Sequence, residues 1–312
     1  MRARLTLTPA AYSRLTVVAL GALTVIVLTG AGVRLTGSGL GCPDWPKCFG
    51  RVIPPLTVHS AIEFGNRVIT GAVGLPVIAA AVLAFFRRPF RWHLALFGAL
   101  LPLGVVGQAV LGGLVVRDHL APGLVMGHFL LSMILLDAAF ALWWCSRHEP
   151  GERARSRDPV SVWAVRGLVP LGQFTVLAGT FVTHAGPHRG EYKGQIVGRF
   201  DFRGADTLSW LVNRHGVVAA LYGLGAVAVW FLLRRAGADG RARRPVTLLC
   251  GLLAAQGALG ILQYRLHLPA ELVWLHVLLA VMTWLTTLWG VAAAGRLAPS
   301  AARVRSASAV AA

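Results

Sequence analysis

The sequence predicts an all-α polytopic membrane protein with eight transmembrane helices arranged as two pseudo-symmetric four-helix bundles. The first observation is composition: 56% of the 312 residues are hydrophobic and 13% are charged, which is unlike a soluble domain. The second is that eight apolar stretches reach the roughly 20 residues that a helix needs to cross a bilayer. The third is a repeat of polar residues between the two halves. The predicted spans are about 12–33, 57–86, 92–116, 121–144, 161–183, 209–233, 245–265 and 270–294.

The spans differ in the polar residues that they carry. The first follows the basic segment MRARLTLTPAAYSR, which has no convincing cleavage site, so we expect an uncleaved span. The second begins with HSAIEFGNR, and the third and fourth contain the first copy of the repeat. The fifth ends in VTHAGPHRG, the sixth carries His215 near its start, and the seventh and eighth contain the second copy. All are rich in Gly and Ala, which predicts closely packed helices.

The distribution of arginine predicts the orientation. Arginines cluster in both tails and in the alternate connections 87–91, 147–157 and 234–244. By the positive-inside rule we expect these segments and both termini to be cytoplasmic, with a cytoplasmic tail from about residue 295. The formal charge of +18 lies in these short connections, so it does not predict nucleic-acid binding. The segments expected to face outward are 34–56, 117–120, 184–208 and 266–269.

Two segments align without a gap. GQAVLGGLVVRDHLAPGLVMGHFLL starts at Gly107, and AQGALGILQYRLHLPAELVWLHVLL starts at Ala255. Apolar matches are common in such segments, so the polar matches carry the comparison. The matched polar pairs are Gln108 with Gln256, Arg117 with Arg265, His119 with His267, and His128 with His276. We therefore expect two parallel four-helix halves, an N-terminal one over 1–150 and a C-terminal one over 151–312.

Each half carries two histidines at corresponding places. His59 and His215 open the second and sixth spans, while His128 and His276 lie about two turns into the fourth and eighth. Two imidazoles facing across a four-helix bundle are typical axial ligands of haem iron. Hydrogen bonding between helices is the alternative, and zinc is disfavoured because no Cys or carboxylate cluster accompanies each pair. Arginines at the outer edge suit the haem propionates: these are Arg34, Arg117, Arg214 and Arg265.

One stripe distinguishes the halves. His59, Glu63 and Arg67 are four residues apart and share a helix face, whereas small residues occupy the matching positions after His215. Ionisable residues within a span usually face the bundle interior and serve a function. The stripe indicates that the first half handles a reacting haem and the second a resident one, and we count Arg67 as a cofactor-binding residue. The alternative is a Glu63–Arg67 ion pair that stabilises the helix.

Four sequence features resemble the haem A synthase family of bacterial and mitochondrial membrane enzymes: VRLTGSGLGCPDWPKCFG, HSAIEFGNRVITG, GPHRG and the two His-bearing LP/AP…H segments. The resemblance covers nearly all of residues 15–290. It implies an eight-helix, two-bundle enzyme that oxidises the C8 methyl group of haem O to a formyl group, giving haem A for terminal oxidases. It also implies that His215 and His276 ligate a resident haem b. His59 and His128 would line the pocket of the substrate, haem O.

The implied reaction is two successive hydroxylations of a methyl group, followed by loss of water. Glu63 matches the essential glutamate of the family, and we expect it to accept a proton or to orient water beside a cationic intermediate. His59 and His128 complete the expected catalytic set. No flavin or nicotinamide fingerprint is present, so electrons must pass to an unidentified acceptor. A prenyltransferase that makes haem O is the expected partner, and a homo-oligomer remains open.

Two other functions remain open from the residues alone. A di-haem b-type electron-transfer protein without substrate oxidation needs the same four histidines but neither Glu63 nor the cysteine loop. A transporter with repeated halves should carry its polar groups at mid-membrane, whereas these cluster toward the outer face.

Cys42 and Cys48 flank PDWPK in the first outward segment, where an oxidising exterior favours a disulfide. Such a bond would be either a structural staple or a labile, redox-active pair. We expect Cys145 and Cys250 to be inert. His184 stands where the family commonly has glycine and is expected to be an interfacial side chain or an additional pocket group. Asp137 has no assigned role.

Overall fold

The computed structural model describes residues 6–55, 57–152, 155–156, 158–192, 194–237 and 240–297. Within these residues, eight helices are long and apolar enough to cross a membrane, which confirms the predicted multi-pass fold. The helices are α1 (Pro9–Leu35), α2 (Val58–Leu83), α3 (Trp92–Arg117), α4 (Pro122–Arg147), α5 (Pro159–Ala185), α6 (Thr207–Arg235), α7 (Gly240–Arg265) and α8 (Ala270–Ala294). The predicted tail lies outside the described residues from 298 onward.

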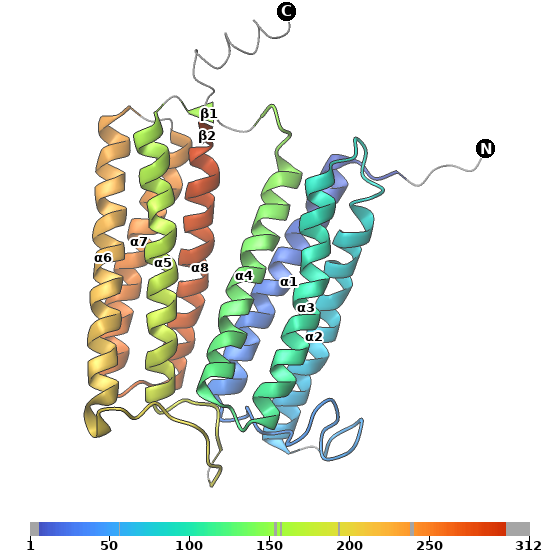
Figure 1. Cartoon of the computed structure of the whole chain (residues 1–312), viewed down its shortest axis with the longest axis vertical. Helices are drawn as coiled ribbons and strands as arrows, with labels where there is room; N and C mark the ends of the chain where they lie inside the picture. Colours follow the sequence, from blue (N-terminus) through green and yellow to red (C-terminus); the bar gives the residue numbers. More distant parts are fainter. Residues whose placement is uncertain are drawn as a thin grey trace, which may run out of the picture.

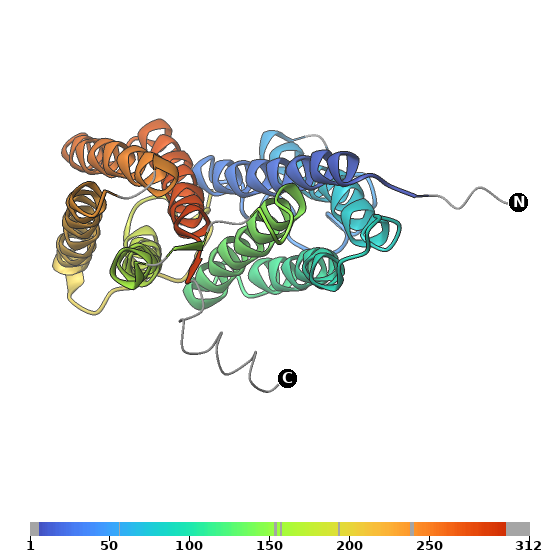
Figure 2. The ribbon, with the colours of Figure 1, turned by 90° about the horizontal axis from the view of Figure 1, so that it is seen from above.

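The helices form two groups of four (Figures 1 and 2). Helices α1 to α4 pack as one ring, in which α1 contacts α2 and α4, and α3 contacts α2 and α4. Helices α5 to α8 form a second ring with the same order of contacts. The two rings meet where α8 packs against α1 and α4, and where α4 contacts α5. Trp284 of α8 belongs to the same buried apolar cluster as the core of the first ring.

Local sequence signals explain where several helices begin. Proline stands at the first helical position of α1, α4 and α5, where its missing N–H costs no hydrogen bond. Thr57 caps α2 in a reciprocal arrangement with Ser60. Asp158 caps α5 by accepting the backbone N–H groups of Val160 and Ser161.

The helices differ from the predicted spans by a few residues at most ends. The largest difference is α7, which starts at Gly240 instead of residue 245. Its first turn is arginine-rich and therefore extends the helix beyond the apolar stretch that defined the predicted span. The short connecting elements are the 3-10 helix η1 (Gly204–Asp206) and the parallel pair β1 (Arg155–Ser156) and β2 (Arg296–Leu297).

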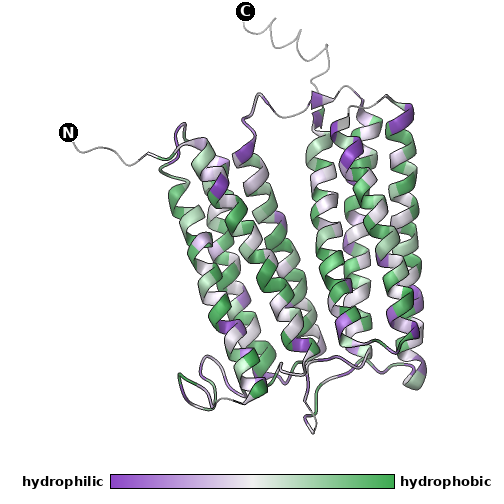
Figure 3. Ribbon diagram, turned by 180° about the vertical axis from the view of Figure 1, so that it is seen from behind, coloured by the Kyte–Doolittle hydropathy of each residue, from purple (hydrophilic) through white to green (hydrophobic). Residues whose placement is uncertain are grey.

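The loops expected to face outward all lie at one end of the molecule, opposite the start of α1 and the end of α8 (Figure 1). Hydrophilic residues gather near the helix ends and in the connections, while the long helix faces are largely apolar (Figure 3). Large apolar side chains such as Leu75, Leu103 and Leu224 are exposed on these faces, as expected of surfaces that contact lipid.

The connections α3–α4 and α7–α8 have the same backbone conformation. His119 and Leu120 have φ of 49° and 59°, and His267 and Leu268 both have φ of 62°. Two consecutive non-glycine residues with positive φ are uncommon, so their occurrence at aligned positions supports the internal repeat.

Candidate functional site

The second half brings two of its histidines together. The ring centroids of His215 on α6 and His276 on α8 are 6.4 Å apart, and the ring planes are inclined by 73°. A metal–imidazole bond is about 2 Å long, so two imidazoles on opposite sides of one metal ion have ring centroids roughly 6 Å apart. The spacing therefore fits one iron between these two side chains.

Glycines on neighbouring helices make room for the imidazoles. A Cβ atom at Gly179 would lie 3.2 Å from Cε1 of His215, and one at Gly260 would lie 3.5 Å from Cε1 of His276. In the first half, a Cβ at Gly112 would lie 3.3 Å from Cε1 of His128. Gly112 and Gly260 are aligned in the repeat, as are the histidines that they face. The space that these glycines leave beside the imidazoles fits the predicted role of the bundle interiors, which is to hold a porphyrin between histidines.

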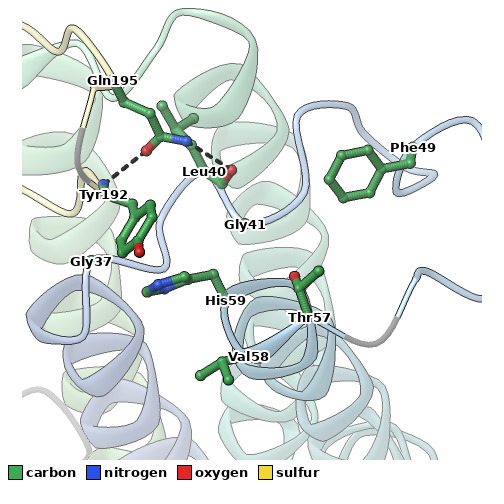
Figure 4. A pocket seen from close by; sticks show the side chains of 9 residues that line it. All are labelled: Gly37, Leu40, Gly41, Phe49, Thr57, Val58, His59, Tyr192 and Gln195. Carbon is green, nitrogen blue, oxygen red and sulfur yellow. Dashed lines mark hydrogen bonds between the residues drawn. The ribbon is translucent and has the colours of Figure 1, made fainter.

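His59 lies at the outer end of α2 and is half-buried. Its Nδ1 atom is 2.9 Å from Oγ of Ser38, and the ring of Tyr192 lies against it with centroids 4.1 Å apart. The imidazole borders a cavity of about 470 Å³, also lined by Leu40 and Gln195 (Figure 4). None of these contacts involves His128, so the expected pairing of His59 with His128 stays a prediction.

Glu63 is buried directly beneath the loop between α1 and α2. Its Oε2 atom accepts the backbone N–H of Cys42 at 2.7 Å, and its Oε1 atom accepts Nη2 of Arg67 at 2.6 Å. Arg67 also donates to the carbonyl oxygens of Asp44 at 3.2 Å and Lys47 at 2.9 Å. The ion pair that the sequence offered as the alternative interpretation is thus present, and both of its members hold the loop as well.

The cysteine loop is a compact structure docked on the first bundle. Cys42 and Cys48 form a disulfide, as predicted, and both are fully buried. Trp45 lies on α3 at Gly113, where an added Cβ would come within 2.8 Å of the indole ring. Arg117, expected near a propionate, is exposed and donates to the carbonyl oxygen of Trp45 at 3.4 Å.

The segment between α5 and α6 crosses from the second half to the first. The backbone N–H of Gly39 donates to Gly190, and Gln195 donates to the carbonyl oxygen of Leu40 at 3.3 Å (Figure 4). Arg34 donates to the carbonyl oxygen of His188 at 2.5 Å. Residues of the second half therefore cover part of the cavity beside His59. No motif or periodicity predicts this contact, because it joins residues about 150 positions apart.

The remaining candidates lie in different surroundings. Arg214 is exposed and lies over the ring of Trp210 at 5.2 Å, and Arg265 is exposed at the end of α7. His184 is 2% exposed, and its Nδ1 atom donates to the carbonyl oxygen of Thr180 at 2.9 Å. Its burial favours a place inside the protein over a solvated interfacial position.

Asp137 joins the two bundles. Its carboxylate accepts the indole N–H of Trp284 at 2.6 Å, and these residues lie on α4 and α8. The sequence offered no role for this aspartate because its partner lies 147 residues away.

Comparisons with known proteins identify relatives across almost the whole chain. The family model described as "Cytochrome oxidase assembly protein" matches residues 13–61 and 57–288. A Thermus thermophilus protein named "Protoheme IX farnesyltransferase" is 32% identical over 296 residues, covering 88% of this chain and 47% of that protein. A protein from Exiguobacterium sibiricum named "Heme A synthase" is 32% identical and covers 52% of this chain and 56% of its own length. A Shewanella oneidensis protein of the same name is 25% identical, covering 78% of this chain and 85% of its own length. The chain spans about half the length of the first two of these relatives.

Proposed function

Because the chain belongs to the cytochrome oxidase assembly protein family, we propose that it is a haem A synthase. It oxidises the C8 methyl group of haem O to a formyl group by two hydroxylations and loss of water, giving haem A for terminal oxidases. The observation that carries the proposal is the asymmetry of the halves. One half holds two histidines at the spacing of axial ligands, and the other holds a buried carboxylate below a docked loop.

The second half is the electron-transfer half in this proposal. His215 and His276 hold a resident haem b, which supplies one-electron transfer when bound. Gly179 and Gly260 keep the space around the two rings free. Arg214 and Arg265 stand at the outer end of this half, where a guanidinium can bind a propionate bidentately.

The first half is the substrate half. His59 and His128 line the pocket of haem O, and Arg34, Arg67 and Arg117 are the cofactor-binding arginines of this half. The carboxyl group of Glu63 is paired with Arg67 and accepts the backbone N–H of Cys42. A carboxylate has about four lone-pair sites, which is more than these hydrogen bonds use. Glu63 can therefore take a proton from water or substrate, or stabilise positive charge that develops on the substrate in a site with little water.

The location and the partners of the protein follow from the same proposal. The protein lies in the bacterial cell membrane with both termini in the cytoplasm, because the arginine-rich connections occupy the same end of the molecule as the start of α1 and the end of α8. A prenyltransferase that makes haem O is its partner. The Thermus relative supports this, since it bears the name of a farnesyltransferase and more than half of it lies outside the match to this chain. Electrons leave to a separate carrier.

The test is co-expression with a source of haem O, followed by chromatography of the extracted haems. The wild-type chain should yield haem A. Glu63→Ala should retain bound haem, because the histidines are intact, and should reduce haem A to the level of cells without the protein. Glu271→Ala, which removes an exposed glutamate at the start of α8, is the matched control. Bound haem without haem A in the wild type would instead identify a di-haem electron-transfer protein.

A further inference from the structure

We propose that Thr36 and Ser38 are positioning residues that fix the tautomer of His59 and direct its Nε2 atom to the iron of the substrate. Both residues lie in the first outward segment, directly after α1. Oγ1 of Thr36 is 2.9 Å from Oγ of Ser38, which is 2.9 Å from Nδ1 of His59. This inference rests on the proposed function, because it takes His59 as a ligand of haem O.

The direction of the hydrogen bonds follows from counting protons. Oγ1 of Thr36 contacts the carbonyl oxygens of Gly32 and Val33 at 2.9 and 3.1 Å. Carbonyl oxygens only accept hydrogen bonds, so the single hydroxyl proton of Thr36 points to them. Ser38 must then donate its own proton to Thr36.

The same count determines the state of the imidazole. Since the proton of Ser38 is directed to Thr36, its oxygen can only accept at the Nδ1 contact. Nδ1 of His59 is therefore the protonated nitrogen, and Nε2 carries the free lone pair that a metal requires. A histidine ligand commonly donates its second ring nitrogen in this way, which fixes both tautomer and ring orientation.

The arrangement distinguishes His59 from His128 and His276. The Nδ1 atoms of His128 and His276 are buried and have no hydrogen-bond partner among the described residues. Ser38 is fully buried, so its hydroxyl is held in place. Tyr192 contacts the face of the same imidazole. A ligand that must accept a new substrate in each turnover thus has its orientation fixed by the protein before the substrate arrives.

The test uses the full chain, purified in detergent and titrated with ferric protohaem, which binds without requiring turnover. Thr36→Val keeps the shape of threonine and removes its hydroxyl, whereas Thr36→Ser keeps the hydroxyl. Thr36 is exposed, so both proteins should fold. Ser38→Ala removes the acceptor itself. Thr24→Val removes a hydroxyl of α1 that bonds to the backbone of its own helix, and it is the matched control.

Loss of a hydrogen-bond partner behind a metal ligand commonly weakens metal binding about 10- to 100-fold. We expect about tenfold weaker binding in the first half for Ser38→Ala and a smaller loss for Thr36→Val, with Thr36→Ser and Thr24→Val at the wild-type value. Haem bound in the first half gives the electron paramagnetic resonance signal that persists in His215→Ala. We expect this signal to change in Ser38→Ala. The signal lost in His215→Ala is the internal control and should not change.

Equal haem affinity and equal spectra for Thr36→Val and Thr36→Ser, together with an unchanged Ser38→Ala, would overturn the inference. A first-half signal that does not respond to His59→Ala would overturn it as well. Failure of the proposed function is separate, because it appears as absence of haem A from cells that express the wild-type chain.

Discussion

Arg67→Ala tests whether the stripe on α2 holds the cysteine loop in place. The guanidinium joins the carboxylate of Glu63 to the carbonyl oxygens of Asp44 and Lys47. Its removal leaves Glu63 as a buried carboxylate without its cation, since the side chain of Glu63 is 8% exposed. We expect the disulfide between Cys42 and Cys48 to become accessible to a reductant much more often.

The size of the effect follows from the contacts. Removing one member of a buried ion pair costs about 3–5 kcal/mol. Arg67 retains 19% exposure of its side chain, so we take the lower end. Both cysteines are fully buried, and reduction therefore requires local opening of the loop. A change of about 3 kcal/mol in the opening free energy corresponds to roughly 100-fold faster reduction, because each 1.4 kcal/mol is a factor of ten.

The assay is the rate of disulfide reduction by dithiothreitol at neutral pH, followed by maleimide labelling and a gel shift. The free cysteines Cys145 and Cys250 are replaced by alanine throughout, so that they do not add to the signal. Arg51→Ala is the matched control, because it removes an exposed arginine close to the same loop. If Arg67→Ala were reduced no faster than Arg51→Ala, the proposed clamp would be wrong.

Three further predictions concern the bundles themselves. Gly179→Ala places a Cβ 3.2 Å from His215, so haem b content should fall, whereas Gly251→Ala, with nothing within 4 Å of the added atom, should retain it by absorption spectroscopy. Asp137→Ala leaves the buried indole N–H of Trp284 without its acceptor and should cost about 1–3 kcal/mol; thermal unfolding should show a lower midpoint than for Asp137→Asn, and equal midpoints would contradict the bond. Hydrogen bonds from Ser161 and from the backbone of Val160 lower the pKa of Asp158. The stability from this cap is therefore present above the ordinary aspartate pKa and lost as pH falls through the lowered value, so Asp158→Asn should flatten the acid limb of the unfolding midpoint against pH.

The sequence predicted the fold because its signals are local. Apolar length defined the eight spans. The spacing of His59, Glu63 and Arg67 offered, as one of two interpretations, the ion pair that the structure contains. The disulfide between Cys42 and Cys48 was also predictable, since the two cysteines lie six residues apart in one outward segment. Each of these features depends on residues within a single helix or loop.

The features that the sequence did not predict all depend on how distant segments meet. Tyr192 contacts His59 across 133 positions, and no periodicity or motif connects two such residues. The arginines illustrate the same limit. Arg34 was expected beside a propionate, and in the structure its guanidinium donates to the carbonyl oxygen of His188. A charge at the end of a span predicts a polar partner, but the choice between a ligand and a backbone carbonyl is made by the fold.

The two halves that meet near residue 150 depend on each other structurally. The repeat defines two similar halves in the chain. The first-half site, however, takes part of its cover from Tyr192 and Gln195 of the second, and the core of the first bundle includes Trp284 of α8. Separation of the halves would expose this apolar surface and remove the ring that lies on His59. The segment that contacts His59 is itself anchored to the second bundle, because His188 is hydrogen-bonded to the carbonyl oxygen of Leu268 near the start of α8. This connection gives the two proposed haem sites a direct structural link along the outer end of the molecule.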